Sequence, residues 1–279
     1  MEKVLIIGRR SNLSKALATR LPAANIVASD DIEDLVVHLD PSEPVHIIYN
    51  TFVKSSLLRT LDDPVEYSRY TFEILAKFVS ICRACHQGIR SIIYTSSSSV
   101  YGDNSLASEL DHCEIRGLYP AVKLASEFFL QDHLRETSIR VIVPRVFNMY
   151  GGQDEFSIVA KIAHALRSDT ELVIANEGEA IRDFIAIDDI VDAYVALMGS
   201  SFQGVINIGT GKGMSVRRVI EAAERAFDAK LKIRNVRNSE ILVSVAAIDR
   251  LRNLLPTHQF RSVERYYADI AGKGPSTFL

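Results

Sequence analysis

Short apolar runs alternate with longer amphipathic segments along the first half of the chain. Runs rich in Val and Ile that end in polar residues or glycine predict buried strands at 4–7, 25–29, 45–49, 91–95 and 139–143. Apolar residues at helical spacing predict helices at 11–21, 67–85 and 119–136, and a shorter one at 32–39. This alternation predicts an α/β fold with a doubly wound, Rossmann-like parallel sheet, whose ligands bind beyond the carboxyl ends of the strands.

The second half of the chain continues with shorter elements. It predicts helices at 156–167, from Asp188, from Ser215 to about 227 and at 262–271, with strands at 172–175, after Arg182 and Asp183, and from Gly204. We therefore expect residues 1–150 and about 182–209 to form a dinucleotide-binding domain. Residues 151–181 and 210–279 would form a smaller, interleaved substrate-binding lobe.

Composition narrows the class of protein. The chain has 279 residues, a net charge of −3 and a pI near 6.2, which gives no electrostatic case for nucleic acid or an anionic membrane. No apolar run approaches the roughly 18 to 20 residues that span a bilayer, and none suggests a signal peptide, so cytoplasm is expected. The three cysteines cannot form a disulfide framework, and the Cys82/Cys85 pair lies in a predicted helix. The scattered histidines predict no metal site.

The segment from Ser91 to Glu127 contains the candidate chemistry. SIIYT predicts a strand that ends in a run of serine hydroxyls, and YPAVKLASE predicts a helix on which Tyr119 and Lys123 are i, i+4 neighbours. A free tyrosine has a pKa of about 10, and a nearby ammonium favours its phenolate. With a serine to hold the substrate oxygen, this set of residues suits hydride transfer at a secondary alcohol. The YxxxK spacing alone is weak evidence, because it recurs by chance.

The start of the chain favours a bound dinucleotide. The strand at 4–7, Gly8 and the helix that follows can place a pyrophosphate on a helix N-terminus. A GxxGxxG pattern from Gly8 has Ser11 and Ser14 at its later glycine positions. Asp30, or its neighbour Asp31, favours NAD through the adenosine ribose, whereas Arg9 and Arg10 would suit the 2′-phosphate of NADP. All four charges are also compatible with an ordinary solvated surface.

Taken together, five motifs resemble the NAD-dependent epimerase/dehydratase branch of the extended short-chain dehydrogenase/reductase superfamily, which acts on nucleotide sugars. They are TSSSSVYG (95–102), YPAVKLASE (119–127), PRVFNMYG (144–151), RDFIAIDDIVDA (182–193) and NIGTG (207–211). The resemblance implies Tyr119 as acid/base, Lys123 as its activator and Ser97 as the hydroxyl that orients the reacting carbon.

The resemblance also implies binding residues. The expected NAD(P) contacts, with NAD favoured, are Gly8, Arg9, Arg10, Ser11, Asn12, Leu13, Asp30, Asn50, Thr51, Thr95, Tyr119 and Lys123. The expected contacts to a nucleotide-diphosphate sugar are Ser97, Ser99, Asn148, Arg182, Arg237 and Glu240, with the Asn148 amide free for a ligand.

Two departures from the family refine this expectation. Dehydratases of this branch have Asp-Glu directly after the catalytic hydroxyl, where this chain has Ser98 and Ser99. The segment between the second strand and Val45 is short, so one strand of the sheet is expected to be missing.

These patterns predict interconversion of a nucleotide sugar at C4, as a 4-epimerase. The alternatives are an NADPH-dependent 4-keto sugar reductase and a non-catalytic cofactor-binding protein of the same fold. The family also implies a homodimer formed by the helices at 67–85 and 119–136, although Phe72, Phe78, Phe128 and Phe129 suit a core equally well.

Overall fold

The chain folds into two compact units. The computed structural model describes residues 3–51 and 64–272. Unit 1 comprises residues up to Val100, Cys113–Arg145 and Tyr194–Ile206, and unit 2 comprises Tyr101–His112, Val146–Ala193 and the residues from Asn207 onward. The predicted roles of two lobes, dinucleotide binding and substrate binding, remain predictions; each unit is described by itself.

Unit 1 is built on a parallel sheet, as the apolar runs predict. Its strands are β1 (Val4–Ile7), β2 (Asn25–Val27), β3 (Val45–Tyr49), β4 (Ile89–Tyr94), β5 (Ser96–Ser97), β7 (Arg140–Val146) and β11 (Gly204–Ile208). Their order is β11-β7-β4-β3-β1-β2, with β5 paired to β7, and the pairs from β2 to β7 are parallel. The sheet ends at β2, because residues 28–44 add no strand to it, as the short segment there predicts.

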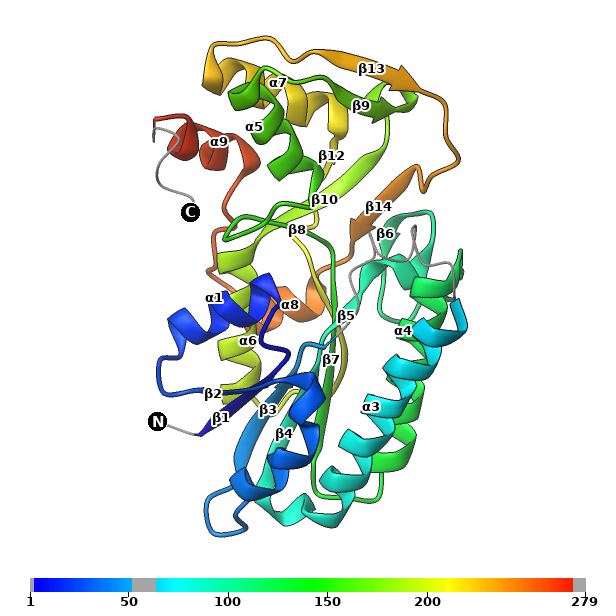
Figure 1. Cartoon of the computed structure of the whole chain (residues 1–279), viewed down its shortest axis with the longest axis vertical. Coiled ribbons are helices and arrows are strands. Elements are labelled where there is room, and N and C mark those ends of the chain that lie inside the picture. The colour runs from blue at the N-terminus through cyan, green and yellow to red at the C-terminus, as the bar shows by residue number, and fades with distance from the viewer. Residues whose placement is uncertain (1–2, 52–63, 273–279) are drawn as a thin grey trace. The chain divides into compact units, whose positions relative to one another are not determined.

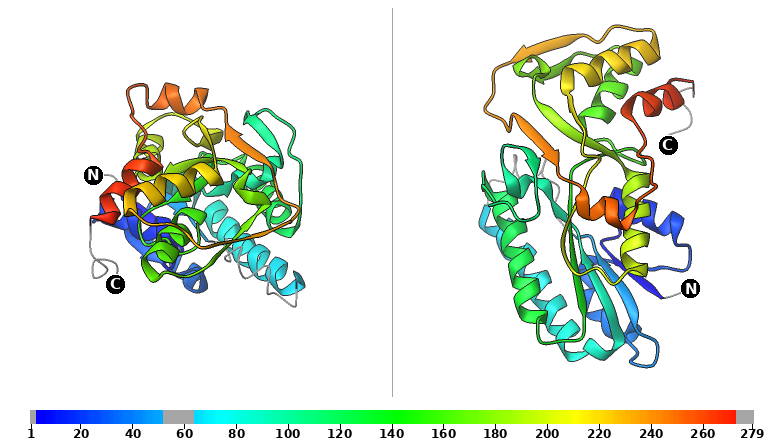
Figure 2. Two further views of the ribbon diagram at one scale, coloured as in Figure 1. Left: turned by 90° about the horizontal axis from the view of Figure 1, so that it is seen from above. Right: turned by 180° about the vertical axis from the view of Figure 1, so that it is seen from behind.

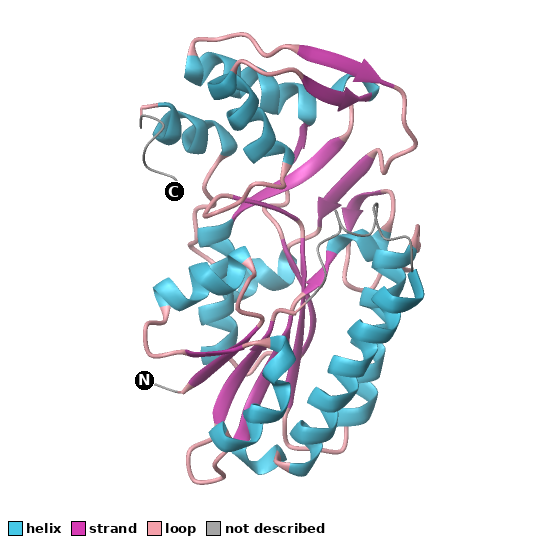
Figure 3. Ribbon diagram, in the orientation of Figure 1, coloured by secondary structure: helices cyan, strands magenta, loops and turns pink. Residues whose placement is uncertain are grey.

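Helices cover both faces of this sheet (Figures 1 and 3). They are α1 (Asn12–Arg20), the 3₁₀-helix η1 (Ser29–His38), α3 (Pro64–Ala84), the short η2 (His86–Gly88), η3 (Ser98–Tyr101), α4 (Leu118–Leu134) and α6 (Ile187–Gly199), whose first residues, up to Ala193, belong to unit 2. The long helices α3 and α4 run side by side along one face, which the rear view in Figure 2 also shows.

The core of unit 1 lies between α3, α4 and the sheet. Leu5, Ile47 and Ile92 from the strands are fully buried there, together with Phe78 from α3. Phe72 and Phe129 pack against this core, whereas Phe128 is 65% exposed. Among Phe72, Phe78, Phe128 and Phe129, Phe128 is therefore the most exposed.

The strand register brings the expected cofactor residues to one edge of the sheet. Ile7 pairs with Val27 and Tyr49, and Tyr49 pairs with Tyr94. The residues that follow these strand ends, including Gly8, Asn50 and Thr95, therefore leave the sheet at its carboxyl edge, where doubly wound folds bind ligands.

Unit 2 combines a mixed sheet with a helical cluster. Its elements are β6 (Asn104–Ala107), β8 (Asn148–Tyr150), α5 (Ile158–Ser168), β9 (Leu172–Ala175), η4 (Asn176–Gly178), β10 (Ile181–Ala186), β12 (Gly213–Ser215), α7 (Val216–Phe227), β13 (Ile233–Val236), β14 (Val243–Ala246), α8 (Asp249–Leu254) and α9 (Val263–Ala271). One sheet has the order β12-β10-β14-β6 with β8 paired to β10, and β13 pairs with β9. Helices α5, α7 and α9 pack around Val159, Val219 and Tyr267.

One local prediction was wrong. Arg182 and Asp183 lie inside β10 rather than before it, because the strand begins one residue earlier, at Ile181. The short helix expected at 32–39 is present as the 3₁₀-helix η1, which begins earlier, at Ser29, and has non-helical backbone at Asp31. Ser215 caps α7 as expected, since its side chain accepts a hydrogen bond from the Arg218 amide.

The described helices of the chain include none that is both long and apolar enough to cross a membrane.

Candidate active site

Ser97, Tyr119 and Lys123 come together in unit 1. Ser97 lies in β5, directly beyond the end of β4, while Tyr119 and Lys123 lie one turn apart on α4. The side chains of Ser97 and Tyr119 share a hydrogen bond. The Lys123 ammonium is buried, with 3% of the residue exposed, and it donates to the Thr95 carbonyl oxygen at 2.9 Å. An ammonium has three N–H donors, and this bond uses one of them.

Burial dominates the electrostatics of this site. It raises the pKa of Tyr119, and the hydrogen bond from Ser97 only partly opposes that rise. Burial also lowers the pKa of Lys123 to about 7, although the negative charge of Glu127 acts to raise it. The expectation that the Lys123 ammonium favours the phenolate of Tyr119 stays a prediction, because burial is the largest influence on the pKa of both groups in this structure.

A buried ion pair that the sequence analysis missed lies next to Lys123. Glu127, the next residue along the same stripe of α4, accepts hydrogen bonds from Arg145 through Nη2 at 2.7 Å and Nε at 3.2 Å. The Ser96 hydroxyl also bonds to Glu127. The i, i+4 spacing of Lys123 and Glu127 was visible in the sequence; the contact with Arg145 was not, because it depends on packing between α4 and β7.

Gly8 marks where a dinucleotide backbone would approach. Its φ of +111° suits glycine, and a Cβ there would lie 2.5 Å from the backbone oxygen of Asn50, so a side chain has no room. Asn50 Oδ1 and Thr51 Oγ1 are buried and have no hydrogen-bond partner among the described residues. A tight glycine turn and unsatisfied polar atoms at the carboxyl edge of the sheet fit a bound dinucleotide.

The serines that replace the later fingerprint glycines share one partner. Asn50 Nδ2 donates to Ser11 Oγ at 2.7 Å and to Ser14 Oγ at 2.9 Å. Ser11 is the N-cap of α1, but its hydroxyl makes no cap hydrogen bond. The first turn of α1, which includes Asn12 and Leu13, therefore lacks the side-chain cap that a serine normally supplies.

The expected ribose contact Asp30 lies beyond β2, at the start of η1. Its Oδ1 accepts a hydrogen bond of 2.5 Å from Tyr70 of α3. This bond, together with burial, raises the pKa of Tyr70, and the positive charge of Arg10 acts in the opposite direction. Asp30, Tyr70 and Arg10 are thus neighbours, and both Arg9 and Arg10 are exposed.

The expected substrate contacts outside Ser97 and Ser99 lie in unit 2. Asn148 in β8 donates through Nδ2 to the Asp183 carbonyl at 3.2 Å, so its amide is not wholly free, contrary to expectation. Arg182 pairs with Glu240, with 3.2 Å between Nη2 and Oε2, and Arg237 is exposed beyond β13. In unit 1, the buried Ser99 Oγ has no hydrogen-bond partner among the described residues.

Asp183 explains the NIGTG motif, although the sequence analysis gave it no role. The carboxylate is fully buried and accepts hydrogen bonds from the Thr210 amide and hydroxyl and from the amides of Gly211 and Ala246. A Cβ on Gly209 would lie 2.7 Å from Asp183 Oδ2. The glycine therefore lets this loop close over the carboxylate.

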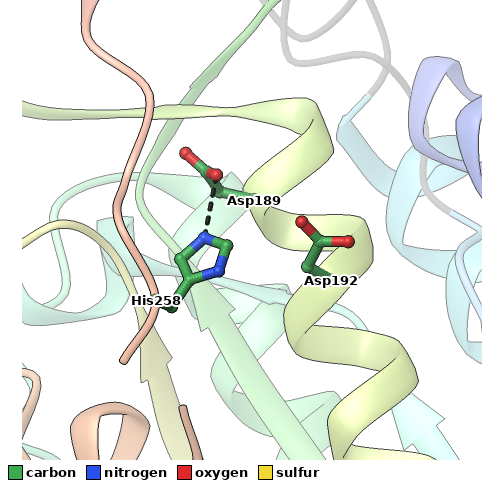
Figure 4. Close-up of side chains that lie close together, drawn as sticks. All are labelled: Asp189, Asp192 and His258. Carbon is green, nitrogen blue, oxygen red and sulfur yellow. Dashed lines mark hydrogen bonds and ion pairs between the residues drawn. The ribbon is translucent and has the colours of Figure 1, made fainter. Parts of the chain in front are cut away.

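A second polar cluster in unit 2 comprises Asp189, Asp192 and His258 (Figure 4). Their nearest polar atoms all lie within 4.8 Å of one another, a spacing that a metal ion could accept. Asp189 already accepts from His258 Nε2 at 2.9 Å and pairs with the Arg261 guanidinium, which also approaches Asp192 at 3.4 Å. The Arg261 cation thus already supplies positive charge to both carboxylates, and the cluster joins α6 to the segment before α9.

A parallel doubly wound sheet with a Ser-Tyr-Lys set at its carboxyl edge defines a short-chain dehydrogenase/reductase. The chain belongs to the NAD dependent epimerase/dehydratase family, whose model matches residues 2–209. It is therefore an enzyme of that family, as the resemblance of its motifs implied.

Individual relatives are distant. The chain is 27% identical to UDP-glucuronic acid decarboxylase 3 of Arabidopsis thaliana over 252 residues, covering 83% of this chain and 68% of that protein. Its structure resembles UDP-N-acetylglucosamine 4-epimerase from Methanobrevibacter ruminantium, solved with UDP-N-acetylmuramic acid, with a TM-score of 0.84, 21% identity and 97% of both chains covered. It also resembles Thermus thermophilus UDP-glucose 4-epimerase in complex with NAD, with a TM-score of 0.82, 19% identity, and coverage of 98% of this chain and 99% of that one.

Proposed function

We propose that this protein is a nucleotide-sugar 4-epimerase in which Tyr119 is the acid/base. The observation that supports this function is the hydrogen-bonded Ser97–Tyr119 pair, one helical turn from the buried Lys123 amine. General acid/base catalysis needs a proton acceptor within hydrogen-bonding reach of the reacting hydroxyl, and a phenol already bonded to a serine hydroxyl meets that condition.

Each residue has a distinct part in the reaction. Ser97 donates to the C4 oxygen and orients it, and Tyr119 Oη takes the proton of the C4 hydroxyl. A bound nicotinamide supplies the means to accept the C4 hydride and return it. After the 4-keto sugar rotates within the site, the hydride adds to the opposite face of C4, and Tyr119 gives its proton back to the C4 oxygen. Lys123, as an ammonium, stabilises the phenolate between these two proton transfers.

The residues after Ser97 favour epimerisation over elimination of water. Elimination needs an acid for the leaving hydroxyl and a base for the carbon-bound proton. Ser98 and Ser99 stand where dehydratases have Asp-Glu, and neutral hydroxyls are poor substitutes for either group.

The second candidate function is decarboxylation of a nucleotide uronic acid, and it is supported by the match to UDP-glucuronic acid decarboxylase 3 over 83% of the chain. Oxidation at C4 would make such a sugar a β-keto acid. The C5–C6 bond then breaks with loss of CO2, its electrons pass to the C4 carbonyl as an enolate, C5 takes a proton, and the hydride returns to C4. This route uses the same Ser97, Tyr119 and Lys123.

The proposed cofactor is NAD, held by the turn from Gly8 to Leu13 and by Asn50, Thr51 and Thr95. Asp30 supports NAD over NADP, because a carboxylate accepts from a ribose hydroxyl and repels a 2′-phosphate. Arg10, close to Tyr70 and Asp30, is the group that would admit NADP. Calorimetric titration with NAD and NADP compares the two directly; tighter binding of NADP would contradict the proposal.

The proposed substrate is a nucleotide-diphosphate sugar bound by Asn148, Arg182, Arg237 and Glu240, in addition to Ser97 and Ser99. Arginine guanidinium groups suit the diphosphate through paired N–H donors. We also propose a homodimer through α3 and α4, supported by the exposed Phe128 ring. Sedimentation of the wild type and of Phe128→Glu tests this association.

One experiment separates the candidate reactions. Purified protein is incubated with UDP-glucose, UDP-N-acetylglucosamine and UDP-glucuronate, with and without added NAD, and the products are followed by NMR. A C4 epimer of unchanged mass supports epimerisation. Release of CO2 and a pentose product from UDP-glucuronate would favour decarboxylation, and NADPH consumption on a 4-keto sugar would favour a reductase.

A further inference from the structure

Three buried charged side chains form a continuous group behind Tyr119. Lys123, Glu127 and Arg145 are 3%, 1% and 5% exposed, respectively. Charged side chains are rarely buried to this degree unless they are paired. When Lys123 is protonated, this group of three holds two cations and one carboxylate, and Lys123 lies one helical turn from the Tyr119 phenol.

The carboxylate of Glu127 is held in a fixed position. Arg145 grips it through Nη2 and Nε, and the Ser96 hydroxyl bonds to Oε1. Paired guanidinium–carboxylate bonds restrict orientation as well as adding energy. Glu127 therefore acts on Lys123 across one helical turn from a fixed position, and its negative charge opposes the loss of the lysine proton on burial.

Among the described residues, Glu127 is the charged group that acts on the pKa of Lys123, and the neighbouring tyrosines do not supply a counter-charge. Its Nζ lies 5.1 Å from the centre of the Tyr94 ring in β4, and Tyr67 of α3 interacts with both Tyr94 and Tyr119. Burial raises the pKa of Tyr94 and of Tyr67, so both phenols are neutral near neutral pH. Thr95 contributes only its carbonyl dipole.

We propose that Glu127, clamped by Arg145 and Ser96, is a positioning residue that keeps Lys123 as an ammonium beside Tyr119. Without this carboxylate the buried amine would lose its proton, and the phenolate of Tyr119 would lose the cation that stabilises it. Arg145 has the opposite effect on the charge of Lys123, because its guanidinium pairs with the same carboxylate and weakens the effect of that carboxylate on Lys123. The inference rests on the proposed acid/base role of Tyr119, but the charge state of Lys123 can be measured without catalysis.

The test is an NMR titration of the lysine side chain in protein carrying ¹³C at lysine Cε. The Lys123 signal is assigned as the one absent from Lys123→Arg. Glu127→Gln keeps the shape and removes the charge, so we expect the Lys123 midpoint to fall by about one pH unit or more. Arg145→Gln removes a competing cation, so we expect the midpoint to rise. Glu127→Asp retains the charge and should restore most of the wild-type midpoint.

Ser96→Ala is the matched control. It removes one hydrogen bond from Glu127 without changing any charge, so we expect a midpoint close to that of the wild type. A merely structural role for Glu127 would lower the melting temperature of these variants without moving the titration in opposite directions. If Glu127→Gln does not fold, the Arg145→Gln variant provides the test by itself. A Lys123 midpoint that is unchanged or lower in Arg145→Gln would overturn the inference.

Activity gives a second measurement in the epimerase assay. In Glu127→Gln, the basic limb of the kcat/KM profile should move to lower pH along with the Lys123 midpoint. An unmoved midpoint overturns this inference and leaves the 4-epimerase proposal standing. Failure of the wild type to convert any nucleotide sugar would overturn that proposal, while the titration would still report on Glu127.

Discussion

Glu127 in unit 1 and Asp189 in unit 2 are both buried carboxylates bound by an arginine, yet they differ in what surrounds them. Asp189 is fully buried and binds Arg261 and His258, and Arg261 also approaches Asp192. Glu127 faces two buried cations, Arg145 and Lys123. The unit 2 cluster places one guanidinium against the carboxylates of Asp189 and Asp192 and joins two segments, whereas the unit 1 cluster of Lys123, Glu127 and Arg145 lies one helical turn from a phenol. The difference in neighbours leads us to expect that the unit 2 cluster acts on stability and the unit 1 cluster on the acid/base chemistry proposed for Tyr119.

The largest effect is expected at the phenol that the unit 1 cluster serves. Tyr119→Phe removes the proton acceptor, and we expect kcat to fall by about 10²- to 10⁴-fold, the usual contribution of a positioned acid/base. Binding of NAD, measured by calorimetry, should be retained, weakened only by the loss of the Tyr119 hydroxyl among its expected contacts, which separates loss of chemistry from loss of fold. Residual activity within tenfold of the wild type would contradict the assigned role.

The unit 2 cluster should respond in stability. Asp189→Asn leaves Arg261 and His258 with a neutral partner, and we expect the free energy of unfolding to fall by about 3 kcal/mol. Urea denaturation measures this change. The Lys123 midpoint should remain at its wild-type value, and a shift there would remove the distinction between the two clusters.

Burial of Lys123 predicts a pH dependence of stability. Its pKa is about 7 in the folded protein, below the usual lysine value near 10.5, so the unfolded chain binds more protons between these limits. The free energy of unfolding should therefore rise with pH from about 7, by up to about 1.4 kcal/mol per pH unit from this residue. Below pH 7 the cost of burying the protonated Lys123 is fully present. Lys123→Met should lack this slope in denaturation curves taken at successive pH values; equal slopes would show that Lys123 is not buried as an amine.

The smallest effect is expected at His258. His258→Gln retains a donor for Asp189 but loses the ring contact with Phe260, where the ring centres lie 5.0 Å apart. We expect a loss of about 1 kcal/mol in the free energy of unfolding. Thermal denaturation gives the value. A loss as large as that of Asp189→Asn would show that the histidine, rather than Arg261, neutralises the aspartate.

Local pattern was sufficient for most of unit 1. The runs at 4–7, 45–49 and 91–95 form strands in register because β-branched residues buried on both faces specify a parallel sheet. The meeting of Tyr119 and Lys123 also followed from sequence, since four residues make about one helical turn. The run of serines at the strand end was visible in the sequence, and the resemblance to the family singled out Ser97 among them.

The sequence by itself predicted most of the strands and helices of unit 1, the family, and the residues that lie on one helix or at one strand end. Tertiary structure decided the pairing of Glu127 with Arg145, the Asp183 contacts that occupy part of the Asn148 amide, and the rise rather than fall in the pKa of Tyr119. Helical and strand periodicity are properties of neighbouring residues. Burial and charge pairing depend on which distant segments pack together, and desolvation sets the charge of a group only after that packing exists.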